Sequence, residues 1–114
     1  MKPFALPFAA AVLTLLVGNP VLAAGNASRG LEKSQSCQAC HGKNGNLAVT
    51  PDTPMLGGQH AAYLEYALKQ YRSGERQNAQ MNGFASGLSD QDIADLAAWY
   101  ASQEGLVTPR LDEK

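Results

Sequence analysis

The feature that most constrains this sequence is a pair of cysteines within one short motif, Cys37-Gln38-Ala39-Cys40-His41. These are the only 2 cysteines of the chain, so they cannot form a framework of disulfides between distant segments. On a helical backbone, residues 37 and 40 are at positions i and i+3, which places both sulfurs on one face. His41 follows one helical turn after Cys37. The motif therefore gathers two thiols and an imidazole into a single local site.

The C-x-x-C-H pattern is the attachment signature of c-type haem. The thiols of Cys37 and Cys40 can add to the vinyl groups along one edge of a porphyrin, and His41 can then bind the iron from the proximal side. Other interpretations are weaker. A thioredoxin-like dithiol would need a βαβ setting, which the sequence does not show. A zinc site would need about four ligands, and His60 is the only obvious ligand outside the motif. A Cys37–Cys40 disulfide would close a tiny loop and would add little stability. We therefore predict one haem c, held covalently through Cys37 and Cys40.

The N-terminal segment has the pattern of a secretory signal peptide. Lys2 gives it a positive start, and residues 4–17 are almost wholly apolar. This apolar run is shorter than the roughly 20 residues that a membrane-spanning helix needs. We expect cleavage after Ala23 or Ala24 and export to a bacterial periplasm. The predicted organisation is a signal peptide, a folded domain and a C-terminal tail, at residues 1–23, 24–105 and 106–114.

Apolar periodicity predicts short helices in the rest of the chain, from Asn26 towards Cys37, from His60 to Tyr71 and from Ser89 to near Gly105. Asn26 is a suitable N-cap, Gly74 is a stop signal, and Ser89 with Asp92 forms a capping box. The intervening segments, 42–59 and 75–88, contain many Gly and Asn residues and are expected to be loops. No segment has a strand period. The predicted fold class is all-α, with three main short helices and long loops around one haem.

The charge balance indicates which partners to expect. The 9 Lys and Arg residues against 10 Asp and Glu residues give a formal charge of −1, which becomes −2 when Lys2 is removed with the signal peptide. Such a chain has no cationic excess for a nucleic-acid backbone. We expect redox proteins as electron donors and acceptors, docking briefly at an exposed haem edge, and at most peripheral association with membrane complexes.

A second axial ligand to the iron has to come from outside the motif. The candidates are Met55, His60 and Met81. Met55 follows His41 closely in a Pro-containing loop and His60 opens a helix, so both are expected on the His41 side or on the surface. Met81 lies in the 75–88 segment, which as a loop could fold over the distal face. We predict His41 and Met81 as the ligands, since His/Met pairing is how low-spin electron-transfer haems are held.

Together these segments resemble a class I cytochrome c, and most closely a single domain of the small bacterial periplasmic cytochromes whose better-known members carry two such domains in tandem. The resemblance covers about residues 26–103. Its segments are Cys37 to His41, Pro54-Met55-Leu56-Gly57-Gly58-Gln59, Tyr63-Leu64, Ser73-Gly74-Glu75-Arg76, Met81-Asn82-Gly83 and Leu88-Ser89-Asp90-Gln91-Asp92 leading to Leu96-Ala97-Ala98-Trp99-Tyr100.

The resemblance implies roles for individual residues. Pro54 would supply the carbonyl that accepts the His41 Nδ1 proton. Gly30 and Trp99 would lie where the first and last helices cross, with Trp99 buried. Arg76 would pair with a haem propionate, although a solvated loop arginine explains it equally well.

The sequence departs from the two-domain relatives in two respects. It has one C-x-x-C-H motif, so electron sharing between two haems within the chain is not expected, and Phe84 stands where a second methionine is frequent.

These expectations indicate a periplasmic one-electron carrier rather than an enzyme, because two protein ligands leave no open coordination site on the iron. The alternative is a cytochrome subunit that accepts electrons from a partner dehydrogenase, such as a flavoprotein sulfide dehydrogenase. A ligand-binding or peroxidatic haem protein would require Met81 to be absent or labile.

Overall fold

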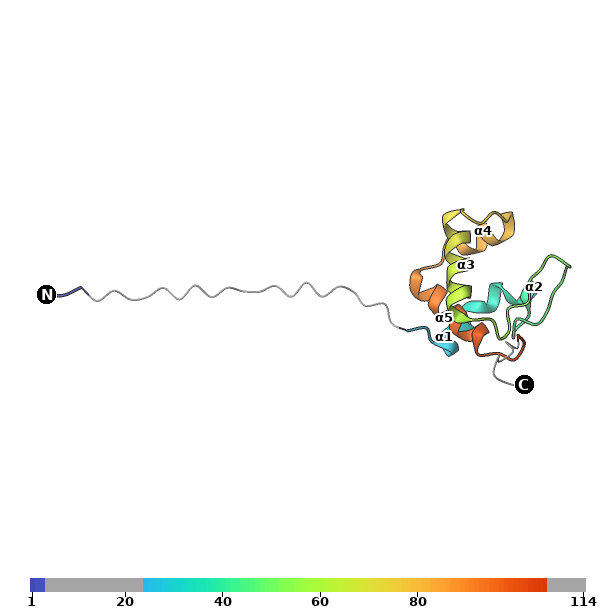
Figure 1. The fold of residues 1–114 in the computed structure, drawn as a ribbon, viewed down its shortest axis with the longest axis horizontal. Coiled ribbons are helices and arrows are strands. Elements are labelled where there is room, and N and C mark those ends of the chain that lie inside the picture. Colours follow the sequence, from blue (N-terminus) through green and yellow to red (C-terminus); the bar gives the residue numbers. More distant parts are fainter. Residues whose placement is uncertain (4–23, 107–114) are drawn as a thin grey trace, which may run out of the picture.

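The computed structural model describes residues 1–3 and 24–106, and in these ranges it contains helices, turns and loops without a strand (Figure 1). The all-α prediction is confirmed. The predicted signal peptide from residue 4 onward and the tail from residue 107 lie outside the described residues. No helix in the described part of the chain is both long and apolar enough to cross a bilayer. The helices are α1 (Ala27–Lys33), the 3-10 turn η1 (Ser34–Ser36), α2 (Gln38–His41), α3 (Ala61–Ser73), α4 (Ala79–Ala85) and α5 (Asp90–Ala101).

The predicted helix caps are present. The Asn26 side chain accepts a hydrogen bond from the Arg29 N–H at 3.0 Å. Ser89 and Asp92 form a reciprocal capping box, with both bonds at 3.0 Å. Gly74 ends α3 in the left-handed conformation, at φ 86°. Caps that depend on local sequence therefore fixed the start of α1, the end of α3 and the start of α5.

The first helix is shorter than predicted. It ends at Lys33, and a 3-10 turn leads from Ser34 to the cysteine motif. Ser34 is fully buried, and its hydroxyl donates to the Leu31 carbonyl oxygen at 2.7 Å while it accepts from Gln38 Nε2 at 2.9 Å. A serine hydroxyl that bonds back to the preceding turn competes with the regular helical bonds and bends the chain.

The prediction of a loop over residues 75–88 is wrong for residues 79–85, which form helix α4. Asn78 caps this helix by accepting from the Met81 N–H at 3.0 Å. The Asn82 amide donates to the carbonyl oxygens of Tyr71 and Arg76, each at 2.8 Å. These bonds to α3 and the turn after it hold a seven-residue helix whose own sequence, with Gly83 inside it, has low helix propensity.

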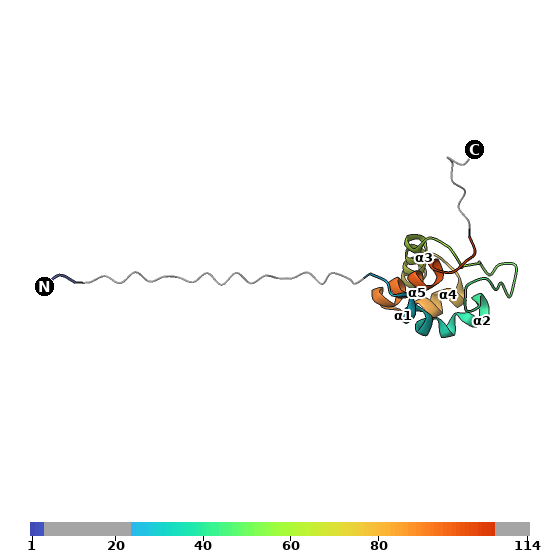
Figure 2. The same cartoon turned by 90° about the horizontal axis from the view of Figure 1, so that it is seen from below.

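Helices α1 and α5 lie side by side in both views (Figures 1 and 2). A Cβ atom on Gly30 would collide with the Asp95 carbonyl oxygen and would lie 2.8 Å from Trp99 Cβ, so only glycine allows this approach. The expected crossing of Gly30 and Trp99 is therefore observed. Trp99 is half-buried rather than buried, because its Nε1 donates to the Lys43 carbonyl oxygen, at 2.7 Å, near the surface.

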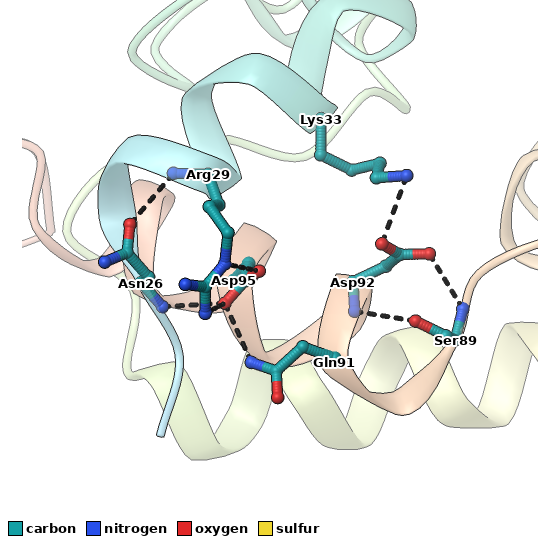
Figure 3. A network of polar contacts seen from close by, with 7 residues as sticks. All are labelled: Asn26, Arg29, Lys33, Ser89, Gln91, Asp92 and Asp95. Atoms are coloured by element: carbon teal, nitrogen blue, oxygen red, sulfur yellow. Dashed lines mark hydrogen bonds and ion pairs between the residues drawn. The ribbon is translucent and has the colours of Figure 1, made fainter. Parts of the chain in front are cut away.

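The apolar core lies between α3 and α5, with Leu64, Leu96, Ala97 and Tyr100 at its centre. Polar contacts fix α1 against the opposite side of α5 (Figure 3). The buried Asp95 carboxylate accepts from Arg29 Nε at 2.8 Å and from the Asn26 N–H at 2.7 Å. The hydrogen bond from Arg29 is the main reason that the pKa of Asp95 falls from 3.8 to about 2.

This shift predicts a loss of stability in acid. The pKa of Asp95 is lower in the folded chain than its ordinary value, so its contribution is complete above about pH 4 and is lost as the pH falls through about 2. We expect Asp95→Asn to lower the free energy of unfolding at pH 7 by roughly 1–2 kcal/mol and to flatten its slope between pH 5 and pH 2. Denaturant unfolding at a series of pH values measures both effects.

Some acid dependence should remain in Asp95→Asn. The pKa of Asp90 is lowered by the hydrogen bond from Arg72, and that of Asp92 by the hydrogen bond from the Ser89 backbone. An Asp95→Asn profile parallel to that of the wild type from pH 5 to 2 would contradict the assignment.

Candidate functional site

The cysteine motif forms a single helical turn at the start of the long loop. Cys37 is the N-cap of α2 and His41 is its last residue. The His41 N–H donates to the Cys37 carbonyl oxygen at 3.0 Å, which closes the turn. Cys37 and Cys40 are both free and half-buried. The backbone thus has the helical conformation that places the two thiols on one face.

The His41 ring is buried and its orientation is fixed. Only 6% of the residue is exposed, and Nδ1 lies 2.9 Å from the Pro54 carbonyl oxygen. Because a carbonyl can only accept, Nδ1 carries the proton of this hydrogen bond. The other ring nitrogen, Nε2, is therefore the one that can bind a metal.

A cavity of about 400 Å³ lies beside the motif, walled by several elements that are far apart in sequence. The motif provides Cys37, Cys40 and His41, and the other walls are mainly apolar side chains of α3, α4 and α5, among them Leu64, Ala67, Met81, Phe84, Leu96, Ala97 and Tyr100. The structure thus brings Met81 to the same cavity as the cysteine motif.

The three candidates for the second ligand differ in position. Met81 is half-buried on α4 and lines the cavity. Met55 also lines it, from the loop that carries Pro54, but 57% of the residue is exposed. His60 is exposed and is not among the residues that line the cavity. Met81 and His41 belong to different walls, which come from α4 and α2.

One part of the cavity wall is polar. The Arg76 guanidinium lies 5.0 Å from the centre of the Tyr71 ring, and its Nη1 donates to the Tyr63 hydroxyl at 3.2 Å. All three residues line the cavity, and Arg76 is half-buried there. The sequence singles out Arg76 but not its two tyrosine partners. The signal was their spacing of eight residues on α3, which places them on the same side of the helix.

Burial also affects the ionisable groups of the cavity. It is the main reason that the pKa of the Cys37 thiol is raised and that the pKa of the Tyr100 hydroxyl rises to about 12. Both shifts favour the uncharged form of the group, which suits the mainly apolar wall.

The donor set and the cavity fit a haem. A haem c needs two thiols on one face, an imidazole with a free nitrogen and an apolar space for the macrocycle. Cys37, Cys40 and His41 provide the first two, and the walls of α3 and α5 provide the third. Met81 adds a thioether, a neutral ligand that cytochromes c use on the second side of the iron.

Comparison with known proteins also points to a protein that binds haem c. The family model described as cytochrome c matches residues 27–104. Cytochrome c-554(548) from Halomonas halodenitrificans is 50% identical over 84 residues, which are 71% of this chain and all of that protein. The cytochrome subunit of sulfide dehydrogenase from Chlorobaculum tepidum is 32% identical over 104 residues, 82% of this chain and 93% of that one.

A solved structure is similar as well. The crystal structure of reduced recombinant cytochrome c4 from Pseudomonas stutzeri superposes with a TM-score of 0.67 at 39% identity. The match covers 74% of this chain and 48% of that one, so this chain spans about half the length of that cytochrome. The helical fold, the cysteine motif beside its cavity and these matches lead to one conclusion: the chain belongs to the cytochrome c family, whose members are electron-transfer proteins with covalently bound haem c.

Proposed function

We propose that this chain carries single electrons in the periplasm through one haem c, attached at Cys37 and Cys40 and ligated by His41 and Met81. The observation that carries the proposal is the cavity that these four residues line together. The bound haem supplies a one-electron couple. Two protein ligands leave no open coordination position, which favours electron transfer over reactions that make or break bonds.

The residues around the cavity have separate tasks in this proposal. The Pro54 carbonyl fixes the tautomer and the direction of the His41 ring through the bond to Nδ1. The thioether of Met81 favours the reduced state and raises the reduction potential. Leu64, Leu96 and Ala97 keep water from the interior of the cavity, which also favours the state of lower charge.

Export would leave the whole domain intact. The described fold begins close to the predicted cleavage site, since a Cβ atom on Gly25 would collide with the Ala94 carbonyl oxygen of α5. Cleavage after Ala23 or Ala24 would therefore remove only residues that precede this contact. A periplasmic destination is supported by the signal-peptide pattern and by the need to attach haem to reduced thiols after export.

The surface near the cavity fits brief contacts with redox proteins. Met55, Tyr63 and Phe84 line the cavity and are at least 45% exposed. The formal charge of the processed chain is −2, which provides little long-range steering. We propose weak docking of electron donors and acceptors around the cavity mouth, with at most peripheral contact to membrane complexes.

A second candidate function is that of a dehydrogenase subunit. It is favoured by the match to the sulfide dehydrogenase cytochrome subunit, which extends over 93% of that protein. In this role the same haem would accept electrons from one flavoprotein partner. Purification from the native source distinguishes the two functions: a stable complex with a flavin spectrum supports the subunit, and a free monomer that several partners reduce supports the carrier.

The spectrum of the purified holoprotein tests the proposed coordination. We expect low-spin spectra in both oxidation states and no rapid change when carbon monoxide is added to the reduced protein, because the Met81 thioether would be the second protein ligand to the iron. Rapid and complete carbon monoxide binding by the native protein would contradict the carrier and would support a ligand-binding haem protein.

A further inference from the structure

The side chain of Asn46 joins the loop after His41 to the segment that follows α5. Its Nδ2 donates a hydrogen bond to the Glu104 carbonyl oxygen at 2.7 Å. Its own backbone N–H donates to the Asn44 side-chain oxygen at 3.1 Å, which sets the local turn. Asn46 is half-buried, and the two ends of its bond to Glu104 are 58 residues apart in sequence.

Two glycine backbones enclose the amide of Asn46. A Cβ atom on Gly57 would lie 2.6 Å from Asn46 Oδ1, and a Cβ atom on Gly105 would lie 2.8 Å from the same oxygen. The Leu106 N–H donates to the Gly57 carbonyl oxygen at 2.9 Å, so residues 104–106 run directly against the Gly57 turn. The Asn46 amide therefore packs between the Gly57 turn and residues 104–106.

The Gly57 turn also determines where the Pro54 carbonyl lies. Pro54 itself is exposed, so its position depends on its neighbours in the chain: the Thr53 N–H before it donates to the Thr50 carbonyl oxygen at 3.0 Å, and Leu56 and Gly57 follow it. Leu56 packs against the core, and its N–H donates to the Gly45 carbonyl oxygen at 2.7 Å. Gly57 comes next: its N–H donates to the Gly45 carbonyl oxygen at 3.2 Å, its carbonyl accepts from the Leu106 N–H, and the Asn46 amide packs against it. The bond from His41 Nδ1 to Pro54 is thus supported by contacts that end at residues 104–106.

We propose that Asn46 is a positioning residue for His41: by joining the Gly57 turn to residues 104–106, it holds the Pro54 carbonyl on the imidazole. This inference rests on the proposed function, since it requires His41 to bind the iron. A looser turn weakens the hydrogen bond from Nδ1, and a less strongly bonded imidazole donates less to the iron. The reduced state is then favoured over the oxidised state.

The test compares Asn46→Ala with Asn26→Ala in the haem-loaded protein. Asn26 is a matched control, because its side chain also makes one hydrogen bond to the backbone, to the Arg29 N–H, and because it caps α1 and is not among the residues that line the cavity. For Asn46→Ala we expect the equilibrium with a one-electron mediator to shift at least about threefold toward the reduced form, or about 30 mV at 59 mV per tenfold. We also expect solvent exchange of the His41 Nδ1 proton, followed by NMR of the reduced protein, to accelerate about tenfold or more. Asn26→Ala should lower the melting temperature and change neither quantity.

If Asn46→Ala lowers the melting temperature but leaves the potential and the proton exchange as in Asn26→Ala, Asn46 is only structural and the proposal is wrong. If Asn46→Ala does not fold, Asn46→Asp takes its place. The same changes in potential and proton exchange are then expected, and their absence again shows that the proposal is wrong. Asp has the same shape, but places an oxygen against the Glu104 carbonyl. The wild-type spectrum distinguishes this result from a failure of the proposed function. If the wild type carries no haem, the proposed function is wrong. If it carries haem and the Asn46 variants leave both readouts unchanged, only the role of Asn46 is wrong.

Discussion

Replacing Met81 with alanine is expected to keep the haem attached but to abolish its low-spin spectrum and to lower the reduction potential by roughly 100 mV or more. The thioether would be lost from the cavity wall that α4 provides, while Cys37, Cys40 and His41 stay in place on α2. The weak near-infrared band from sulfur to ferric iron should disappear as well. Absorption spectroscopy and a potentiometric titration measure these changes.

Met55→Ala is the matched control, because Met55 lines the same cavity from the loop that carries Pro54. With 57% of the residue exposed, its removal should leave the spectrum low-spin and the near-infrared band intact. Loss of that band in Met55→Ala and its retention in Met81→Ala would reverse the ligand assignment.

Removing both thiols, as in Cys37→Ala with Cys40→Ala, is expected to yield a chain that does not unfold cooperatively. Without the covalent links the haem is poorly held, and the cavity of about 400 Å³ is left without its occupant. At about 24 cal/mol per Å³ an empty cavity of this size costs at most on the order of 10 kcal/mol, which is comparable with the whole stability of a small domain. Circular dichroism during heating measures the effect.

Ala39→Ser is the control for the cysteine variants, because Ala39 lies between the two cysteines and is exposed. It should bind haem and melt as the wild type does. A sharp thermal transition in the double cysteine variant, at the wild-type temperature, would show that the fold does not depend on the attached group.

The sequence predicted those parts of the fold that depend on neighbouring residues. Asn26, Gly74 and the pair Ser89 and Asp92 each act within a few positions, and the structure has a cap or a stop at each of them. The cysteine motif is local in the same sense. A helix that depends on such short-range signals can be found without knowledge of the fold.

Helix α4 could not be found in this way, because it is held mainly by contacts with other elements. Asn82 bonds to Tyr71 and Arg76, and Ala85 is fully buried against the rest of the domain. The local sequence around Gly83 favours a turn. Asn78 was the one local signal, as an N-cap three residues before Met81.

In the candidate site, too, local features could be predicted from the sequence and long-range contacts could not. The spacing of Cys37, Cys40 and His41 was sufficient to predict a haem, whereas spacing does not identify the second ligand. Met55 and Met81 both line the cavity and differ in the element that carries them and in exposure. Trp99 was expected to be buried, but sequence could not reveal its hydrogen bond to Lys43 across 56 residues. Asn46 gave no sequence signal at all, because its partners, Gly57, Glu104 and Gly105, are brought to it only by the fold.

Covalent attachment of one haem is tested by the mass of the intact protein, after expression with a working haem c maturation system and purification under denaturing conditions. We expect the mass of the processed chain plus one haem, which remains attached after acid extraction because both links are covalent thioethers. A colourless product with the mass of the bare processed chain would contradict it.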